Sequence, residues 1–197
     1  MIVLLDNGHG KDTAGKRSPD GRLLEYAYAR EITKRMEQAL KAQGYDVRLI
    51  VPEENDISLQ ERCNRVNRIC DQYGTKNVIL VSVHCNAAGM GTSWMTGRGW
   101  EAWTSVGQTK ADELATCIYK AAEKEGLKIR KDETDGDPDK EGHLYILKHT
   151  KCPAVLTENM FQDNKEDVEF LLSENGKQVI TRVNVNGIVK YIKTQKA

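Results

Sequence analysis

"NVILVSVH", residues 77–84, is the stretch that decides the fold class. It is almost entirely aliphatic and rich in β-branched side chains, which is typical of a strand buried on both faces of a parallel sheet. Aliphatic runs at 2–5 (IVLL) and 153–159 (PAVLTEN) have the same character, and 45–51 (YDVRLIV) is a further predicted strand. The chain therefore has several strands that are apolar on both faces, and helices must cover both faces of the sheet that such strands form.

Helical patterns lie between these strands. Apolar residues recur at helical spacing after residue 24, and Gly44 follows as a stop signal. Ser58 with Glu61 three residues later is a capping box that predicts the start of a second helix. The predicted helices span about 24–40, 58–74 and 109–124, with further helical segments from 165 onward. Residues 89–103 are predicted as a loop and an edge strand, and 132–143 as a polar loop.

Strands that alternate with helices indicate an α/β fold with a largely parallel sheet. The length of 197 residues is ordinary for one domain. No internal repeat or low-complexity tract divides the chain. We therefore predict a single three-layer α/β/α domain that spans residues 1–197.

The composition excludes several classes of partner. Lys+Arg and Asp+Glu both number 29, so the net charge of zero gives no support for nucleic-acid binding. No stretch is long and apolar enough to span a membrane, and no signal-peptide pattern is visible. Five cysteines without C-x-x-C spacing predict free thiols in a chain made in the cytoplasm.

Histidines and glutamates cluster where the predicted strands end. His9 follows the first strand, His84 ends the third, Glu158 lies near the end of the last, and Glu25 opens the first helix. Ligands of open parallel sheets bind beyond the carboxyl ends of the strands. Two histidines and one carboxylate form a familiar catalytic zinc set, and a second carboxylate can move protons. On these grounds Glu25 and Glu158 could divide the two roles either way.

A phosphate-binding loop is the competing interpretation of the N-terminal glycines. Residues 10–17, GKDTAGKR, match the pattern G-x-x-x-x-G-K-[ST] at every position except the last. Arg17 stands where a hydroxyl is needed to hold magnesium, and Pro19 and Gly21 mark a turn where a helix should begin. We therefore favour a metal site at His9 over a nucleotide site.

Four ordered motifs carry a resemblance to a known family. They are Gly8-His9-Gly10, the glutamate of LLEYAYA at Glu25, SVHCNA at 82–87 and PAVLTE at 153–158. With these motifs the chain resembles the zinc-dependent N-acetylmuramoyl-L-alanine amidases, the type 3 cell-wall amidases, over essentially its whole length. It departs from the family at Asn7, where proline is frequent, and at NMFQDN (159–164), where many members have G-F-x-S-N.

The resemblance implies a site and a reaction. Carried over by position, it makes His9, Glu25 and His84 the ligands of one Zn²⁺ per chain and Glu158 the catalytic acid/base. The implied reaction is hydrolysis of the amide between N-acetylmuramic acid and L-alanine in peptidoglycan, by an endolysin-like enzyme that acts on the cell wall after release or export. Two rivals stay open: another zinc hydrolase that cuts within the stem peptide, and a non-catalytic peptidoglycan binder.

Several other residues have two interpretations each. Cys85 is a conceivable nucleophile, but alternation along the strand points it away from the His84 face. His143 could reach the mouth of the cleft, whereas His149 is predicted at the surface. Arg62 could pair with an acid and brace the sheet edge, or bind substrate.

Tryptophans and asparagines near the predicted cleft complete the candidates. The tryptophans could stack on sugar rings or simply pack on an edge strand. The asparagines could orient ligands or substrate from behind. These residues are Trp94, Trp100, Trp103, Asn86 and Asn159.

Overall fold

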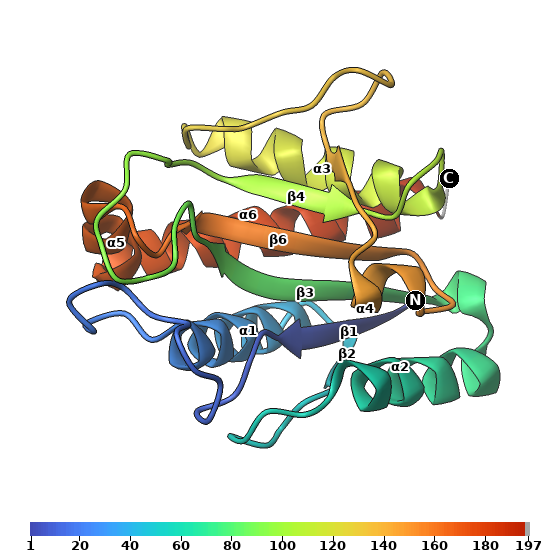
Figure 1. Ribbon diagram of the computed structural model, residues 1–197. Helices are drawn as coiled ribbons and strands as arrows, with labels where there is room; N and C mark the ends of the chain where they lie inside the picture. Colours follow the sequence, from blue (N-terminus) through green and yellow to red (C-terminus); the bar gives the residue numbers. More distant parts are fainter. Residues whose placement is uncertain (196–197) are drawn as a thin grey trace.

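One six-stranded sheet forms the centre of the protein (Figure 1). The computed structural model describes residues 1–195, and the strands follow the order β2-β1-β3-β6-β4-β5. Their bounds are β1 (Ile2–Asn7), β2 (Asp46–Leu49), β3 (Val78–Asn86), β4 (Glu101–Thr104), β5 (Lys140–Glu141) and β6 (Ala154–Phe161).

Most of the strand pairing is parallel, as the sequence predicts. β1 pairs in parallel with β2 and β3, and β3 pairs in parallel with β6. β4 runs antiparallel to β6 and carries β5 on its other side, so the predicted edge strand is not at the edge. The two-residue β5 lies within the predicted polar loop and is too short to show a strand periodicity.

Helices cover both faces of the sheet and complete three layers (Figure 1). α1, α3, α5 and α6 pack on one face, and α2 and α4 pack on the other. Their bounds are α1 (Glu25–Lys41), α2 (Leu59–Tyr73), α3 (Lys110–Lys124), α4 (Tyr145–Lys148), α5 (Lys165–Leu172) and α6 (Glu174–Thr194), with a 3-10 turn η1 (Thr75–Asn77) before β3. Within residues 1–195, no helix combines the length and the apolar character that crossing a bilayer requires.

Alternation along the strands divides the apolar side chains between the two layers. In β1, Leu5 packs in the core beneath α1, whereas Leu4 packs in the core beneath α2. Both side chains are fully buried, which is why the strand reads as one continuous aliphatic run. The same alternation places His84 and Cys85 on opposite faces of β3.

The capping box predicted at the start of α2 forms only in part. The Ser58 hydroxyl accepts the N–H of Glu61 at 3.3 Å, which is one half of the predicted capping box. The Glu61 carboxylate pairs with Arg65 on the next turn at 3.1 Å. A complete capping box forms instead at the start of α3, between Thr109 and Asp112.

Candidate active site

His9, Glu25 and His84 meet where β1 and β3 end and α1 begins. Each offers one ligand atom, and the three atoms lie within 4.8 Å of one another. Glu25 Oε1 lies 3.3 Å from His9 Nε2 and 3.2 Å from His84 Nδ1. The two imidazole rings are edge-on, with centroids 5.0 Å apart. The structure therefore brings together the three residues that the sequence motifs selected as metal ligands.

The Glu25 carboxylate is buried, with 1% of its surface exposed, and every contact favours its charged form. Its Oε1 accepts the backbone N–H of Cys85 at 3.1 Å, and its Oε2 accepts the amide of Gln162 at 3.0 Å. Burial on its own would raise the pKa of Glu25, but hydrogen bonding to His84 and His9 outweighs it and holds the pKa well below its usual range. The site thus contains a preformed anion between two imidazoles.

The Glu25 carboxylate also changes the pKa of the His84 ring. Burial acts to lower the pKa of His84, and the hydrogen bond to Glu25 reverses this and raises it. The ring is also packed closely from below, because a Cβ on Gly8 would lie 2.4 Å from His84 Cε1. A residue larger than glycine would displace the ring, which explains the glycine of the Gly8-His9-Gly10 motif.

Glu158 lies beside this group without belonging to it. It is opposite His84 in the register between β6 and β3, so the two side chains leave the same face of the sheet. Its Oε2 atom is buried and has no hydrogen-bond partner among the described residues. Burial raises the pKa of Glu158 to about 8, and the neighbouring charge of His84 opposes this shift. A half-buried carboxyl with a free oxygen is suited to exchanging a proton.

Glu101 is the next carboxylate along the sheet, opposite Glu158 on β4. Burial would raise its pKa, but ion pairs with Lys140 and Arg130 lower it. Its charge adds to the upward shift of the Glu158 pKa. The two neighbouring carboxyl groups therefore have opposite protonation tendencies, because Glu101 forms ion pairs with Lys140 and Arg130, whereas Glu158 forms none with a Lys or Arg among residues 1–195.

The side chain of Asn159 connects β3 to Trp100 by hydrogen bonds. Its Nδ2 donates to the carbonyl of His84 at 3.0 Å, and its Oδ1 accepts the indole N–H of Trp100 at 3.0 Å. Trp100 is fully buried, so the packing interpretation holds for it and the sugar-stacking one does not. Trp103 donates to Glu101 and is partly buried, as is Trp94.

Other sequence candidates fall outside the group. Cys85 is 4% exposed in the core on the far face, where burial raises its thiol pKa well above the usual value. All five cysteines are free thiols, as predicted. His143 is exposed, and His149 is exposed and stacked on Tyr145. Asn86 donates to Glu101 at 2.9 Å and has no hydrogen bond to a histidine of the site among residues 1–195.

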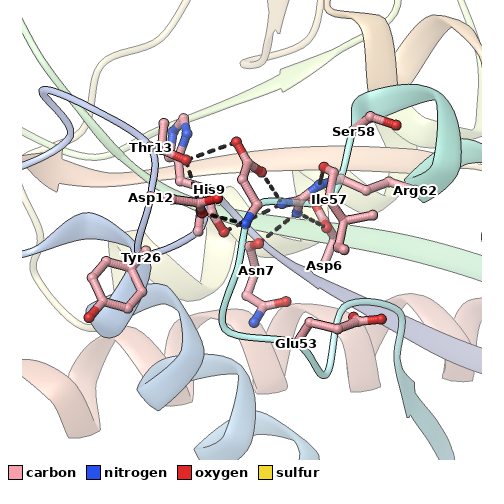
Figure 2. A network of polar contacts seen from close by, with 12 residues as sticks. Asp6, Asn7, His9, Asp12, Thr13, Tyr26, Glu53, Ile57, Ser58 and Arg62 are labelled. Carbon is pink, nitrogen blue, oxygen red and sulfur yellow. Dashed lines mark hydrogen bonds and ion pairs between the residues drawn. The ribbon is translucent and has the colours of Figure 1, made fainter.

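The structure shows two features that the sequence did not specify: the contact of Gln162 with Glu25, and the partners of Arg62. Gln162 belongs to NMFQDN, the segment that departs from the family pattern, and that departure was the available signal. Arg62 is 2% exposed and pairs with Asp6 at 2.6 Å and with Asp56 at 2.9 Å. Figure 2 shows Arg62 beside Asp6. Arg62 thus has the acidic partners that the bracing interpretation requires.

A cavity of about 300 Å³ opens beside the histidine pair. His9 and His84 form one wall, and most of the remaining lining is apolar. The apolar residues are Ile57, Leu59, Leu144, Tyr145, Ile146 and Leu156, from the loop before α2, from α2, from the region of α4 and from β6. Asp6, Asp56, Ser58 and Arg62 complete the lining, and a cavity of this size that combines apolar walls with polar groups is typical of a small-ligand site.

The comparison with protein families decides the identity. The model of the N-acetylmuramoyl-L-alanine amidase family (Amidase_3) matches residues 3–190. The chain belongs to this family. The match includes every element that contributes to the site, from β1 to β6.

Curated relatives of this amidase family member include an endolysin and a bacterial amidase. The endolysin of Bacillus phage SPP1 is 29% identical over 199 residues, which cover 99% of this chain and 67% of the relative. N-acetylmuramoyl-L-alanine amidase CwlM of Bacillus licheniformis is 26% identical over 194 residues, which cover 98% of this chain and 70% of the relative. The chain thus spans about two thirds of each relative's length.

Solved structures share the fold. The amidase Ami1 from Mycobacterium smegmatis superposes with a TM-score of 0.82 at 20% identity, covering 99% of this chain and 98% of that one. The catalytic domain of CwlV from Bacillus (Paenibacillus) polymyxa var. colistinus gives a TM-score of 0.80 at 21% identity, with 98% of each chain covered. The three-layer architecture predicted from the sequence is therefore that of known amidase domains.

Proposed function

We propose that this amidase family member is a zinc-dependent enzyme that hydrolyses the amide between N-acetylmuramic acid and L-alanine in peptidoglycan, and that residues 1–197 form its single catalytic domain. One observation carries the proposal: His9, Glu25 and His84 converge, and Glu158 lies beside them on the same sheet face as His84. The endolysin relative supports action on the cell wall.

The donor set fits one zinc ion. Two imidazole nitrogens and one carboxylate oxygen lie within 4.8 Å of one another, and catalytic zinc sites use three protein ligands of this kind. When bound there, zinc would lower the pKa of a water ligand and polarise the scissile carbonyl. The Cys85 N–H donates to Oε1, the oxygen nearest both histidines, and Gln162 donates to Oε2, so both hold the Glu25 carboxylate in place for this role.

Glu158 is the residue that moves the proton. Its free Oε2 accepts the proton that the attacking water loses and returns it to the departing alanine nitrogen. Glu101 cannot take this role, because Asn86, Trp103, Arg130 and Lys140 already occupy its two oxygens. The buried Cys85 lies on the far face, so the proposed mechanism needs no covalent enzyme intermediate.

Product analysis by mass spectrometry tests the proposal. Purified peptidoglycan is digested, and the released fragments are identified. An intact stem peptide with a free L-alanine amine supports the amidase. Shorter stem fragments would favour a peptidase, and no release by a zinc-loaded protein would favour a binder. Glu158→Gln is the matched inactive control, because it keeps the shape of the site.

A further inference from the structure

The backbone of His9 needs external support. Its φ angle is 60°, in the left-handed region that a non-glycine residue adopts at a cost. Such a conformation persists only where surrounding contacts determine it. The orientation of the His9 ring toward Glu25 therefore depends on whatever holds the loop that follows β1.

Two arginines hold the carbonyl group of His9. Arg30 of α1 donates to it from Nη1 at 2.9 Å, and Arg62 of α2 donates to it from Nη2 at 3.4 Å. Arg30 also donates twice to the carbonyl of Glu53, at 3.1 and 2.8 Å. Helices from both layers thus meet at one carbonyl oxygen of the loop.

Arg62 joins His9 to the sheet. Its Nη1 donates to Asp6 Oδ1 at 2.6 Å and to the carbonyl of Asn7 at 2.7 Å. The other oxygen of Asp6 accepts the hydroxyl of Ser82, two residues before His84 on β3. One buried guanidinium therefore connects the segments that carry both histidines.

The segment 53–58 lies against the loop that follows β1 and carries His9 (Figure 2). Asp56 accepts Arg62 Nη2 at 2.9 Å on Oδ1 and the Thr13 hydroxyl at 2.8 Å on Oδ2. The N–H of Asp56 donates to Asp12 at 2.7 Å. Contact is so close at Gly10 that a Cβ there would lie 2.0 Å from the Asp56 nitrogen.

We propose that Arg62, with Asp56, is a positioning residue for His9: it fixes the loop so that His9 Nε2 faces Glu25 and His84, and metal affinity depends on it. The inference rests on the proposed function, in which His9 is a metal ligand. Lysine could not replace Arg62, because only the guanidinium offers several donors in a planar fork. Supporting residues of this kind change metal affinity about 10- to 100-fold.

Metal affinity of folded variants tests this role. Asp56→Ala is the decisive variant, because the Asp56 side chain is 41% exposed and its loss leaves the Arg62–Asp6 pair intact. We expect its Zn²⁺ affinity, measured by competition with a chromophoric chelator, to fall by about 10- to 100-fold. The absorption spectrum of the Co²⁺-loaded protein should change as well, since it reports ligand geometry. Circular dichroism should match the wild type.

Two further variants complete the test. Arg62→Met should weaken Zn²⁺ binding at least as much. Arg68→Met is its control, because Arg68 is an exposed residue of the same helix whose one ion pair among the described residues is with Glu61 at 3.2 Å. If Arg62→Met does not fold, the Zn²⁺ affinity of Asp56→Ala alone tests the positioning role. Wild-type affinity and an unchanged Co²⁺ spectrum in Asp56→Ala would overturn the positioning role. Failure of the wild type itself to bind zinc would instead contradict the proposed function.

Discussion

Glu158 lies opposite His84 in the pairing of β6 with β3, yet its Oε2 atom has no hydrogen-bond partner among the described residues. His84 is paired with Glu25 instead, and Glu25 Oε1 lies 3.2 Å from His84 Nδ1. The two glutamates near His84 are therefore in different chemical states. One is a charged group held by several donors, and the other is free to exchange a proton.

Glu158→Gln should separate proton transfer from metal binding. The amide keeps the size of the side chain but cannot accept a proton, so turnover should fall by about 100- to 10,000-fold. Zinc content by elemental analysis should stay at one per chain. Glu169→Gln, at an exposed site on α5, is the control and should retain full turnover. Loss of zinc from Glu158→Gln would mean that Glu158 is a ligand.

His84→Ala should empty the metal site. It removes one of the three proposed ligands, and Glu25 then loses the partner that lowers its pKa most. We expect zinc content near zero, no amidase activity, and no further loss when a chelator is added. The wild type should lose its activity on chelation and regain it with added zinc. A chelated, zinc-free wild type with full activity would contradict the metal assignment.

Cys85→Ala should leave turnover nearly unchanged. The thiol is buried on the sheet face away from His84, and burial raises its pKa well above the usual value, so we expect no nucleophilic role for it. Stability should fall by roughly 1 kcal/mol, because the smaller side chain leaves a gap in the core. Cys117→Ala, on α3, is the comparison variant. Abolished turnover with zinc and melting temperature intact would favour a thiol mechanism.

Asp139→Asn should change how stability depends on pH. Burial and the neighbouring carboxyl of Asp137 raise the pKa of Asp139 to about 8, while Thr104 donates to its Oδ2. The folded protein then binds this proton more tightly than the unfolded chain, so the contribution of Asp139 is full below about pH 4 and is lost as pH rises toward 8.

Urea unfolding at pH 5.5 and pH 8.5 measures this effect. The wild type should lose more stability between the two values than Asp139→Asn, because asparagine has no proton to lose. The variant should be the more stable protein at pH 8.5. Equal pH dependence of the two proteins would show that the Asp139 carboxyl does not titrate in this window.

Much of the fold could be predicted from local patterns. The aliphatic runs that became β1, β3 and β6 are long enough to identify buried strands, and the helical spacing in 24–40 matches α1 to within a residue at each end. β4 was harder, because its antiparallel pairing with β6 and its pairing with β5 depend on residues 37 to 57 positions away in the chain. Local periodicity carries no information on such partners.

The sequence by itself determined which residues could form the site. Gly8-His9-Gly10, the helix-opening Glu25, the end of β3 and the end of β6 are adjacent only if the strands are parallel, and the aliphatic pattern already required that. It did not determine how each side chain is held. Tertiary structure decided that Gln162 donates to Glu25 and that Trp100 is fully buried against Asn159. These contacts join residues far apart in the chain, and their energies depend on distances that only the packed fold sets.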